Sequence, residues 1–164
     1  MKNINKILAS IAFLFSLVIY IMTMAPTTSF WDCGEFIATS VIMGVPHPPG
    51  TPFYLLLGNF FSQLPTFDDI GARVNLISPI FSAFAVMFLY LIIVQLIEEW
   101  FGKVKSWPDY FITYGSALIG ALTFAFSDSH WFNAVEAEVY SLSTFFTSIV
   151  VWLILKWSSN SGHS

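Results

Sequence analysis

Charge is scarce in this chain, in which only 10% of the 164 residues are Asp, Glu, Lys or Arg. A soluble domain carries roughly 25% charged residues, so these charges are too few to cover a globule in water. Hydrophobic residues make up 56% of the chain, and the mean hydropathy is +0.73. We therefore predict an integral membrane protein whose surface contacts mostly lipid or other protein.

Basic runs and paired cysteines are also missing. No two of the six basic residues are adjacent and the net charge is −4, so nucleic acid is not expected as a partner. The single cysteine, Cys33, excludes a disulfide within this sequence and is expected to act as a small hydrophobic residue. The His and Cys residues do not have the spacing of a metal site, so no metal ligands are assigned.

Four apolar runs are long enough to cross a membrane as helices. A helix of 18 residues spans about 27 Å, which is close to the thickness of the hydrocarbon layer. The first run can also be interpreted as a signal peptide cleaved after Ala25, but it is longer than the usual apolar core of one. The prediction is an all-α membrane protein with about four spans, at residues 7–24, 76–97, 111–126 and 141–157.

Charged residues are distributed unevenly between the predicted loops. Five of the six basic residues fall on one side of the membrane, which the positive-inside rule makes cytoplasmic: Lys2, Lys6, Lys103, Lys105 and Lys156. The other side carries Arg73 and seven acidic residues: Asp32, Glu35, Asp68, Asp69, Asp128, Glu136 and Glu138. Both ends are therefore predicted to be cytoplasmic, and the loop at residues 25–75 to lie outside.

The outer loop at residues 25–75 contains two short apolar runs, at 36–45 and 53–64. Each is too short to span, so both are predicted to form interfacial or re-entrant helices on the outer side. Four prolines within residues 46–52 separate the two runs and prevent a helix there. The transmembrane module is predicted to occupy residues 1–157, and the polar tail at 158–164 to be disordered.

Two acidic residues follow the first span. If a helix begins near Trp31, then Asp32, Glu35 and Thr39 lie on one face. Two carboxylates there can share acid–base work. The alternative is a structural role, with Asp32 in a capping box with Ser29 and Glu35 in solvent.

Other polar residues on the outer side are candidates for binding. His47, fixed among prolines, can bind phosphate or transfer a proton, or its ring can point to water. Arg73 can clamp a phosphate or pair with Asp68 or Asp69.

The start of the fourth span carries further candidates. A polar stripe is predicted on one helix, with Glu138 facing elsewhere and a position in interfacial water as the alternative. The stripe consists of Glu136, Tyr140, Thr144 and Thr147.

Three segments together resemble one family: residues 30–37 (FWDCGEFI), 47–52 (HPPGTP) and 137–142 (AEVYSL). In this order they are similar to the protein O-mannosyltransferase-like family of multi-pass membrane proteins, which has Bacteroidota and vertebrate branches. The segment at residues 73–76 (RVNL) also resembles the family, and the resemblance extends to about Trp157.

The resemblance implies a glycosyltransferase of the GT-C type, with a catalytic carboxylate in the first outer loop, where Asp32 and Glu35 stand. It implies a polyprenyl-phosphate sugar as donor, a protein or glycan hydroxyl as acceptor, and a site on the periplasmic face of a bacterial inner membrane. No cofactor is firmly implied, and a divalent metal is compatible with this chemistry. The residues assigned to substrate binding are His47, Arg73, Glu136, Glu138 and Tyr140.

Family members are longer, so the remaining transmembrane helices are expected as partners, and these 164 residues alone are expected to be inactive. Two other functions are compatible with the residues: a transporter or channel module, and a non-catalytic membrane scaffold. A transporter is expected to hold charges at the bilayer midplane, whereas these charges cluster at one membrane face. The distribution therefore favours an enzyme.

Overall fold

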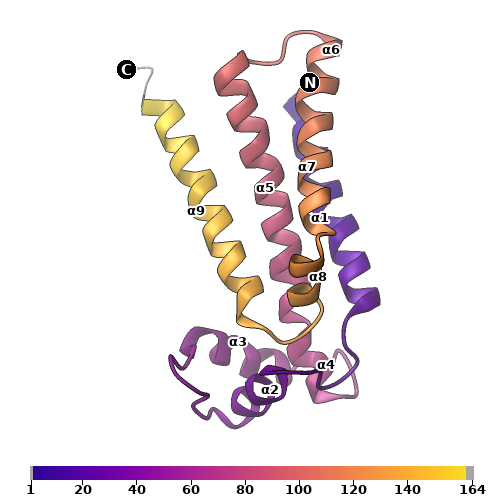
Figure 1. The fold of residues 1–164 in the computed structure, drawn as a ribbon, viewed down its shortest axis with the longest axis vertical. Coiled ribbons are helices and arrows are strands. Elements are labelled where there is room, and N and C mark those ends of the chain that lie inside the picture. The colour runs from indigo at the N-terminus through magenta and orange to yellow at the C-terminus, as the bar shows by residue number, and fades with distance from the viewer. Residues whose placement is uncertain (1, 162–164) are drawn as a thin grey trace.

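The computed structural model describes residues 2–161, which form helices and contain no strand. Three long helices, α1 (Lys2–Thr23), α5 (Ile77–Phe101) and α9 (Val139–Ser161), run roughly along one axis (Figure 1). A fourth rod joins α6 (Trp107–Tyr110), the π-helical turn η1 (Phe111–Gly115) and α7 (Ser116–Ala125). The predicted all-α class is confirmed for this part of the chain.

Three helical segments are long and apolar enough to cross a membrane: residues 3–23, 70–101 and 139–159. The second segment consists of α4 (Ile70–Asn75) and α5. A fourth candidate is bent, because residues 107–125 and α8 (Asp128–Ala134) meet at an angle of 67°. Three to four candidate spans agree with the predicted number of about four.

The central helix of the bundle is α5, which contacts α1, α7 and α9. Small side chains line the buried face of α7, where Ala117, Ala121 and Ala125 are inaccessible to solvent. Such residues let helix backbones approach closely in lipid. The Tyr20 hydroxyl of α1 donates a hydrogen bond to the Ala125 carbonyl at 2.8 Å. This packing makes α1 part of the core of the bundle.

Two short helices and α4 form a layer at one end of the bundle, which we call the short-helix layer (residues 25–75; Figure 1). The short helices are α2 (Cys33–Ile42) and α3 (Pro52–Ser62). They overlap the two short helices predicted at residues 36–45 and 53–64, with somewhat different bounds. Neither lies alongside the long helices. The start of α1 and the end of α9 lie at the opposite end of the bundle (Figure 1).

Close packing of α2 on α3 depends on Gly58. The Asn59 amide group of α3 donates to the Ser40 and Val41 carbonyls of α2, at 3.0 and 3.2 Å. A Cβ atom added at Gly58 would lie 2.6 Å from the Ser40 Cβ and closer still to its hydroxyl oxygen. Glycine is therefore required at this helix crossing.

One prediction about the fourth span is wrong. Because α9 begins at Val139, Glu136 lies in the bend before the helix, and the predicted stripe from Glu136 to Thr147 does not form one helical face. The Glu138 N–H instead donates to the Ser78 hydroxyl of α5, at 3.4 Å.

The polar tail is also helical for longer than predicted. Residues 158–161 continue α9, and the Ser159 hydroxyl donates to the Lys156 carbonyl at 3.0 Å. Such side-chain bonds satisfy carbonyls at a helix end that have no partner within the helix. The rest of the tail, residues 162–164, lies outside the described residues.

Replacing Gly58 with alanine should separate α2 from α3. We expect Gly58→Ala to destabilise the protein by about 1–3 kcal/mol, the usual cost of overpacking. The matched control is Gly115→Ala, where an added Cβ has no atom within 4 Å and where alanine favours a helix by up to about 1 kcal/mol. Thermal unfolding of both variants in detergent measures the difference, and equal melting temperatures would contradict this packing.

The predicted orientation can be tested by labelling single cysteines with a membrane-impermeant reagent. Native Cys33 is fully buried and gives a low background. We expect Thr66→Cys to be labelled in intact cells and Lys105→Cys only after permeabilisation, because positively charged loops stay cytoplasmic. The reverse pattern would place the short-helix layer on the cytoplasmic side.

Candidate functional site

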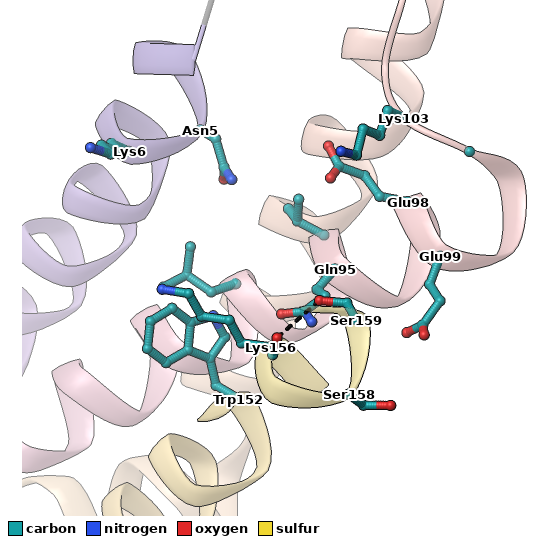
Figure 2. A pocket seen from close by; sticks show the side chains of 13 residues that line it. Asn5, Lys6, Gln95, Glu98, Glu99, Lys103, Trp152, Lys156, Ser158 and Ser159 are labelled. Carbon is teal, nitrogen blue, oxygen red and sulfur yellow. Dashed lines mark hydrogen bonds between the residues drawn. The ribbon is translucent and has the colours of Figure 1, made fainter. Parts of the chain in front are cut away.

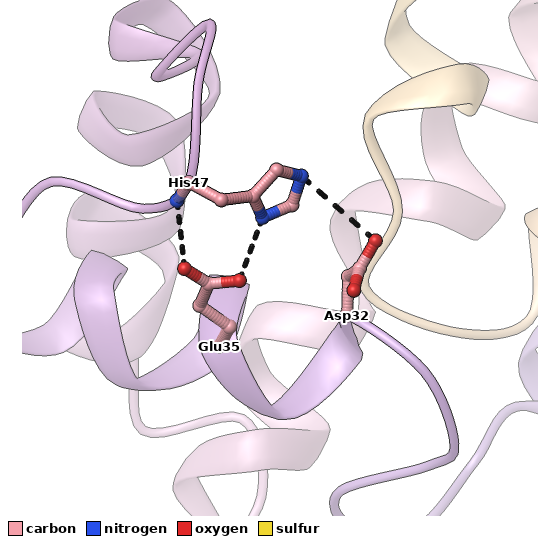
Figure 3. Close-up of side chains that lie close together, drawn as sticks. All are labelled: Asp32, Glu35 and His47. Atoms are coloured by element: carbon pink, nitrogen blue, oxygen red, sulfur yellow. Dashed lines mark hydrogen bonds and ion pairs between the residues drawn. The ribbon is translucent and has the colours of Figure 1, made fainter.

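Asp32, Glu35 and His47 meet in the short-helix layer (Figure 3). One Glu35 oxygen accepts a hydrogen bond from the His47 backbone N–H at 2.7 Å, and the other lies 2.7 Å from His47 Nδ1. The second ring nitrogen, Nε2, lies 4.0 Å from Asp32 Oδ2. Glu35 therefore fixes the imidazole with both oxygens, and the free ring nitrogen faces Asp32. We call these three residues the acid–histidine cluster.

The path of the chain between α2 and α3 places His47 over the first turn of α2. Met43 ends α2 in the left-handed region with a φ of 52°, which turns the chain back. Pro46 is buried, and the His47 ring packs on Phe36 with ring centroids 5.9 Å apart. The imidazole is thus bound to the protein on one side, although 47% of the side chain stays exposed.

Asp32 stands immediately before α2, which begins at Cys33 rather than near Trp31 as supposed. It occupies the N-cap position, yet its side chain makes no capping hydrogen bond, so the capping box with Ser29 is not formed. The side chain is 57% exposed. Its carboxylate is therefore available to a molecule outside the chain.

Glu35 and His47 shift each other's pKa in opposite directions. The hydrogen bond from His47 lowers the pKa of Glu35. The same bond raises the pKa of His47 above 6.5, opposed by partial desolvation and assisted by the charges of Asp32 and Glu138. The interaction stabilises the folded state most between about pH 4.5 and 6.5, and it weakens as the pH rises through the raised pKa of His47 or falls through the lowered pKa of Glu35.

Two buried acids lie between the cluster and the start of α9. Glu138 is 7% exposed, and burial, followed by the charges of Glu136 and Asp32, raises its pKa to about 7. Glu136 is 2% exposed, and its Oε1 has no hydrogen-bond partner. Glu138, expected to face away from the stripe that includes Glu136 and Tyr140, is coupled electrostatically to Asp32 and His47. Glu136 does not lie in interfacial water.

Arg73 ties the end of α3 to the loop before α4. Its guanidinium donates to the carbonyls of Phe67, Ser62 and Asp68, at 2.6, 3.2 and 3.4 Å. It forms no side-chain ion pair with Asp68 or Asp69, and the Asp69 carboxylate instead accepts from the Ala72 N–H at the start of α4. A role for Arg73 in phosphate binding stays a prediction.

Tyr140, in the first turn of α9, is 62% exposed. A role for this side chain in substrate binding likewise stays a prediction.

Asn75 is a positioning residue that composition and spacing did not single out. Its buried amide group donates to the carbonyls of Ala25 and Thr27, at 2.8 and 2.9 Å, and accepts from the Cys33 thiol at 3.7 Å. It thereby holds both sides of the segment that carries Asp32. The sequence feature that could have pointed to Asn75 is its position in the segment at residues 73–76, which resembles the family.

A hollow of about 940 Å³ lies at the other end of the bundle, between α1, α5 and α9 (Figure 2). Its polar lining mixes charges of both signs, with Lys6, Lys103 and Lys156 opposed by Glu98 and Glu99. Lys156 also lies over the Trp152 ring, 4.7 Å from its centroid. The hollow lacks the paired acid and imidazole of the cluster, so we place the candidate site in the short-helix layer.

Residues 32–164 match the family described as the Protein O-mannosyl-transferase TMEM260 N-terminal domain. The chain belongs to this family. The match begins at Asp32 and includes the whole acid–histidine cluster. The resemblance inferred from the three sequence segments is confirmed.

Two curated relatives carry the family's name. The chain is 28% identical over 138 residues to the protein O-mannosyl-transferase tmem260 of Dictyostelium discoideum, covering 83% of this chain and 15% of that protein. It is 28% identical over 151 residues to the TMEM260 protein of Mus musculus, covering 92% of this chain and 19% of that protein. The chain thus spans less than a fifth of either relative, and no solved structure matches it.

Removing the charge of Glu35 should lower the pKa of His47. We expect Glu35→Gln to move this pKa down towards 6.5, because a neutral amide stabilises the imidazolium less than a carboxylate does. Histidine ring NMR of the protein in detergent and metal-free buffer measures the pKa, with His47→Gln identifying the signal among the three histidines. Asp68→Asn is the control, and an unchanged pKa in Glu35→Gln would show that the Glu35–His47 pair does not form.

Proposed function

We propose that this chain is the N-terminal part of a membrane glycosyltransferase that transfers a sugar, with mannose the first candidate, from a polyprenyl-phosphate carrier to a hydroxyl of a protein or glycan. Family membership supports the sugar class, since both relatives are named protein O-mannosyl-transferases. The observation that carries the proposal is the Asp32 carboxylate, exposed and without a side-chain hydrogen bond, beside an imidazole that Glu35 fixes.

The cluster supplies what such a transfer requires. The acceptor oxygen forms a bond to the anomeric carbon of the sugar while the bond from that carbon to the carrier phosphate breaks. The phosphate leaves with the electron pair, and a base takes the proton of the acceptor hydroxyl. Asp32 is the proposed base, because its carboxylate is accessible and Glu35 is occupied by His47.

A second requirement is positive charge near the departing phosphate. When it is protonated, His47 is the cationic group of the cluster, and Glu35 favours the protonated state. The donors of Arg73 are already bonded to three backbone carbonyls, which makes it a weaker candidate. In the metal-free protein we therefore assign phosphate binding first to protonated His47, whose free Nε2 faces Asp32; an ion bound at Nε2 would take the place of that proton and supply the positive charge itself.

The proposed site faces away from the cytoplasm, on the periplasmic side if the host membrane is a bacterial inner membrane. The short-helix layer lies at one end of the bundle, and Lys6, Lys103 and Lys156 lie at the other (Figures 1 and 2). The positive-inside rule supports this orientation. Because the cluster lies in a layer at the bundle end, the arrangement supports an enzyme over an ion-conducting module.

The remaining helices of a longer protein are proposed to complete the donor and acceptor sites. The chain spans only 15% and 19% of the two relatives, so activity is a property to be measured on the full-length protein.

Replacing Asp32 with asparagine should abolish most of the sugar transfer. We expect Asp32→Asn in the full-length protein to lower turnover by about 10²–10⁴, the usual contribution of a general base. Glu35→Gln should have a smaller effect, because it acts through His47. Glu138→Gln should chiefly weaken substrate binding. The assay measures transfer from a polyprenyl-phosphate mannose donor at matched protein levels in membranes.

The control is Asp68→Asn, which removes an exposed carboxylate of the same layer outside the cluster. Its transfer rate should equal that of the wild type. If Asp32→Asn also transfers sugar at the wild-type rate, Asp32 is not the base, and Glu35 becomes the next candidate.

A further inference from the structure

The acid–histidine cluster and the two buried acids beside it have an excess of negative charge. Among the side chains of residues 3–159, the ion pairs of 4.0 Å or less are those of His47 with Asp32 and Glu35. No lysine or arginine side chain in that range forms one. Three carboxylates therefore share one imidazole as their cationic partner: Asp32, Glu35 and Glu138. The charge of Glu136 acts on Glu138 in addition.

The burial of Glu136 and Glu138 makes this excess costly. Buried carboxylates are normally paired with a cation, bound to a metal or protonated. Glu136 Oε1 is buried without a hydrogen-bond partner, and Glu136 lies close enough to Glu138 for its charge to raise the pKa of that residue. The surroundings are therefore those in which a bound cation is stabilised.

The geometry of His47 provides a place for that cation. Glu35 uses both oxygens on the backbone N–H and on Nδ1 of His47, which leaves Nε2 as the free ring nitrogen. A carboxylate that holds the far nitrogen of the ring is the usual arrangement behind a metal-binding histidine. Glu35 is thus suited to orient the ligand rather than to bind the ion itself.

The distance between Nε2 and Asp32 agrees with this role. At 4.0 Å the two atoms are too far apart for a hydrogen bond. Two ligands of one tetrahedral ion with bonds of about 2.1 Å are separated by roughly 3.4 Å, so a shift of less than about 1 Å admits an ion between them. Asp32, Glu35 and His47 each offer a ligand-type atom within 4.8 Å of the other two.

We propose that a divalent cation of the Mn²⁺ or Zn²⁺ class binds between Nε2 of His47 and the carboxylate of Asp32, with Glu35 orienting the imidazole and Glu138 supplying buried negative charge. These ions accept mixed imidazole and carboxylate ligands. Binding through Oδ2 leaves Oδ1 of Asp32 for another partner. The proposal rests on the cluster and its charge and holds independently of sugar transfer.

Metal binding can be measured directly with Mn²⁺ on the full-length protein. The protein is purified in detergent, treated with EDTA, and titrated with MnCl₂ while electron paramagnetic resonance reports free Mn²⁺. We expect saturable binding of about one ion per chain. His47→Gln and Asp32→Asn should each weaken binding at least about tenfold, and Glu35→Gln by about 10–100-fold, as for residues that orient a ligand. Asp68→Asn should bind as the wild type does.

Thermal unfolding of every variant checks that the fold is intact. If His47→Gln unfolds, Asp32→Asn decides the question, because the Asp32 side chain is exposed and makes no hydrogen bond. The proposal is overturned if the wild type binds no Mn²⁺, or if Asp32→Asn binds it with wild-type affinity. In that case a proton on Glu138, in place of a metal ion, offsets the charge of the buried pair Glu136 and Glu138. Since no transfer is measured, either result leaves the transferase proposal to its own assay.

Discussion

The amide group of Asn75 connects the candidate site to the membrane bundle. It lies at the end of α4, just before α5, and holds the carbonyls of Ala25 and Thr27 together with the Cys33 thiol. The chain that leaves α1 is thus bonded to the start of the central helix, and α2 begins from a fixed point. A side chain with two donors and an acceptor is needed here, because the backbone groups of this segment lie outside regular helix and need partners. These three bonds of Asn75 hold the segment that carries Asp32.

Composition was sufficient to predict the bundle, and periodicity was not sufficient to predict the site. Long apolar runs have few alternatives to a helix in lipid, so the class and approximate number of spans followed from the sequence. Asp32 and Glu35 were grouped correctly on local spacing. The contact with His47 depends on the left-handed turn at Met43 and the burial of Pro46, which are tertiary features. Residue identity alone does not specify the direction of that turn.

The misplacement of Glu136 has a comparable physical origin. A helical period was extended back from α9 through residues whose backbone is engaged elsewhere, since the Glu138 N–H bonds to Ser78 of α5. Interhelical contacts of this kind override local preference. The result is a pair of buried acids next to the cluster where a polar stripe along one helix was expected, and this pair adds acidic groups to those of Asp32 and Glu35.

The order in which the site residues occur along the chain affects how the protein is made. Asp32, Glu35 and His47 leave the ribosome within 16 residues of one another, whereas Glu138 follows His47 by 91 residues. At about 5–20 residues per second, roughly 5–20 s pass between the emergence of His47 from the ribosome and that of Glu138. During this interval the buried residues Cys33, Phe36 and Ile37 of α2 lack the side chains of Ala137 and Leu142, which belong to the same apolar cluster. The short-helix layer is therefore a segment whose apolar face needs protection, by lipid or by the insertion machinery, until α9 is in place.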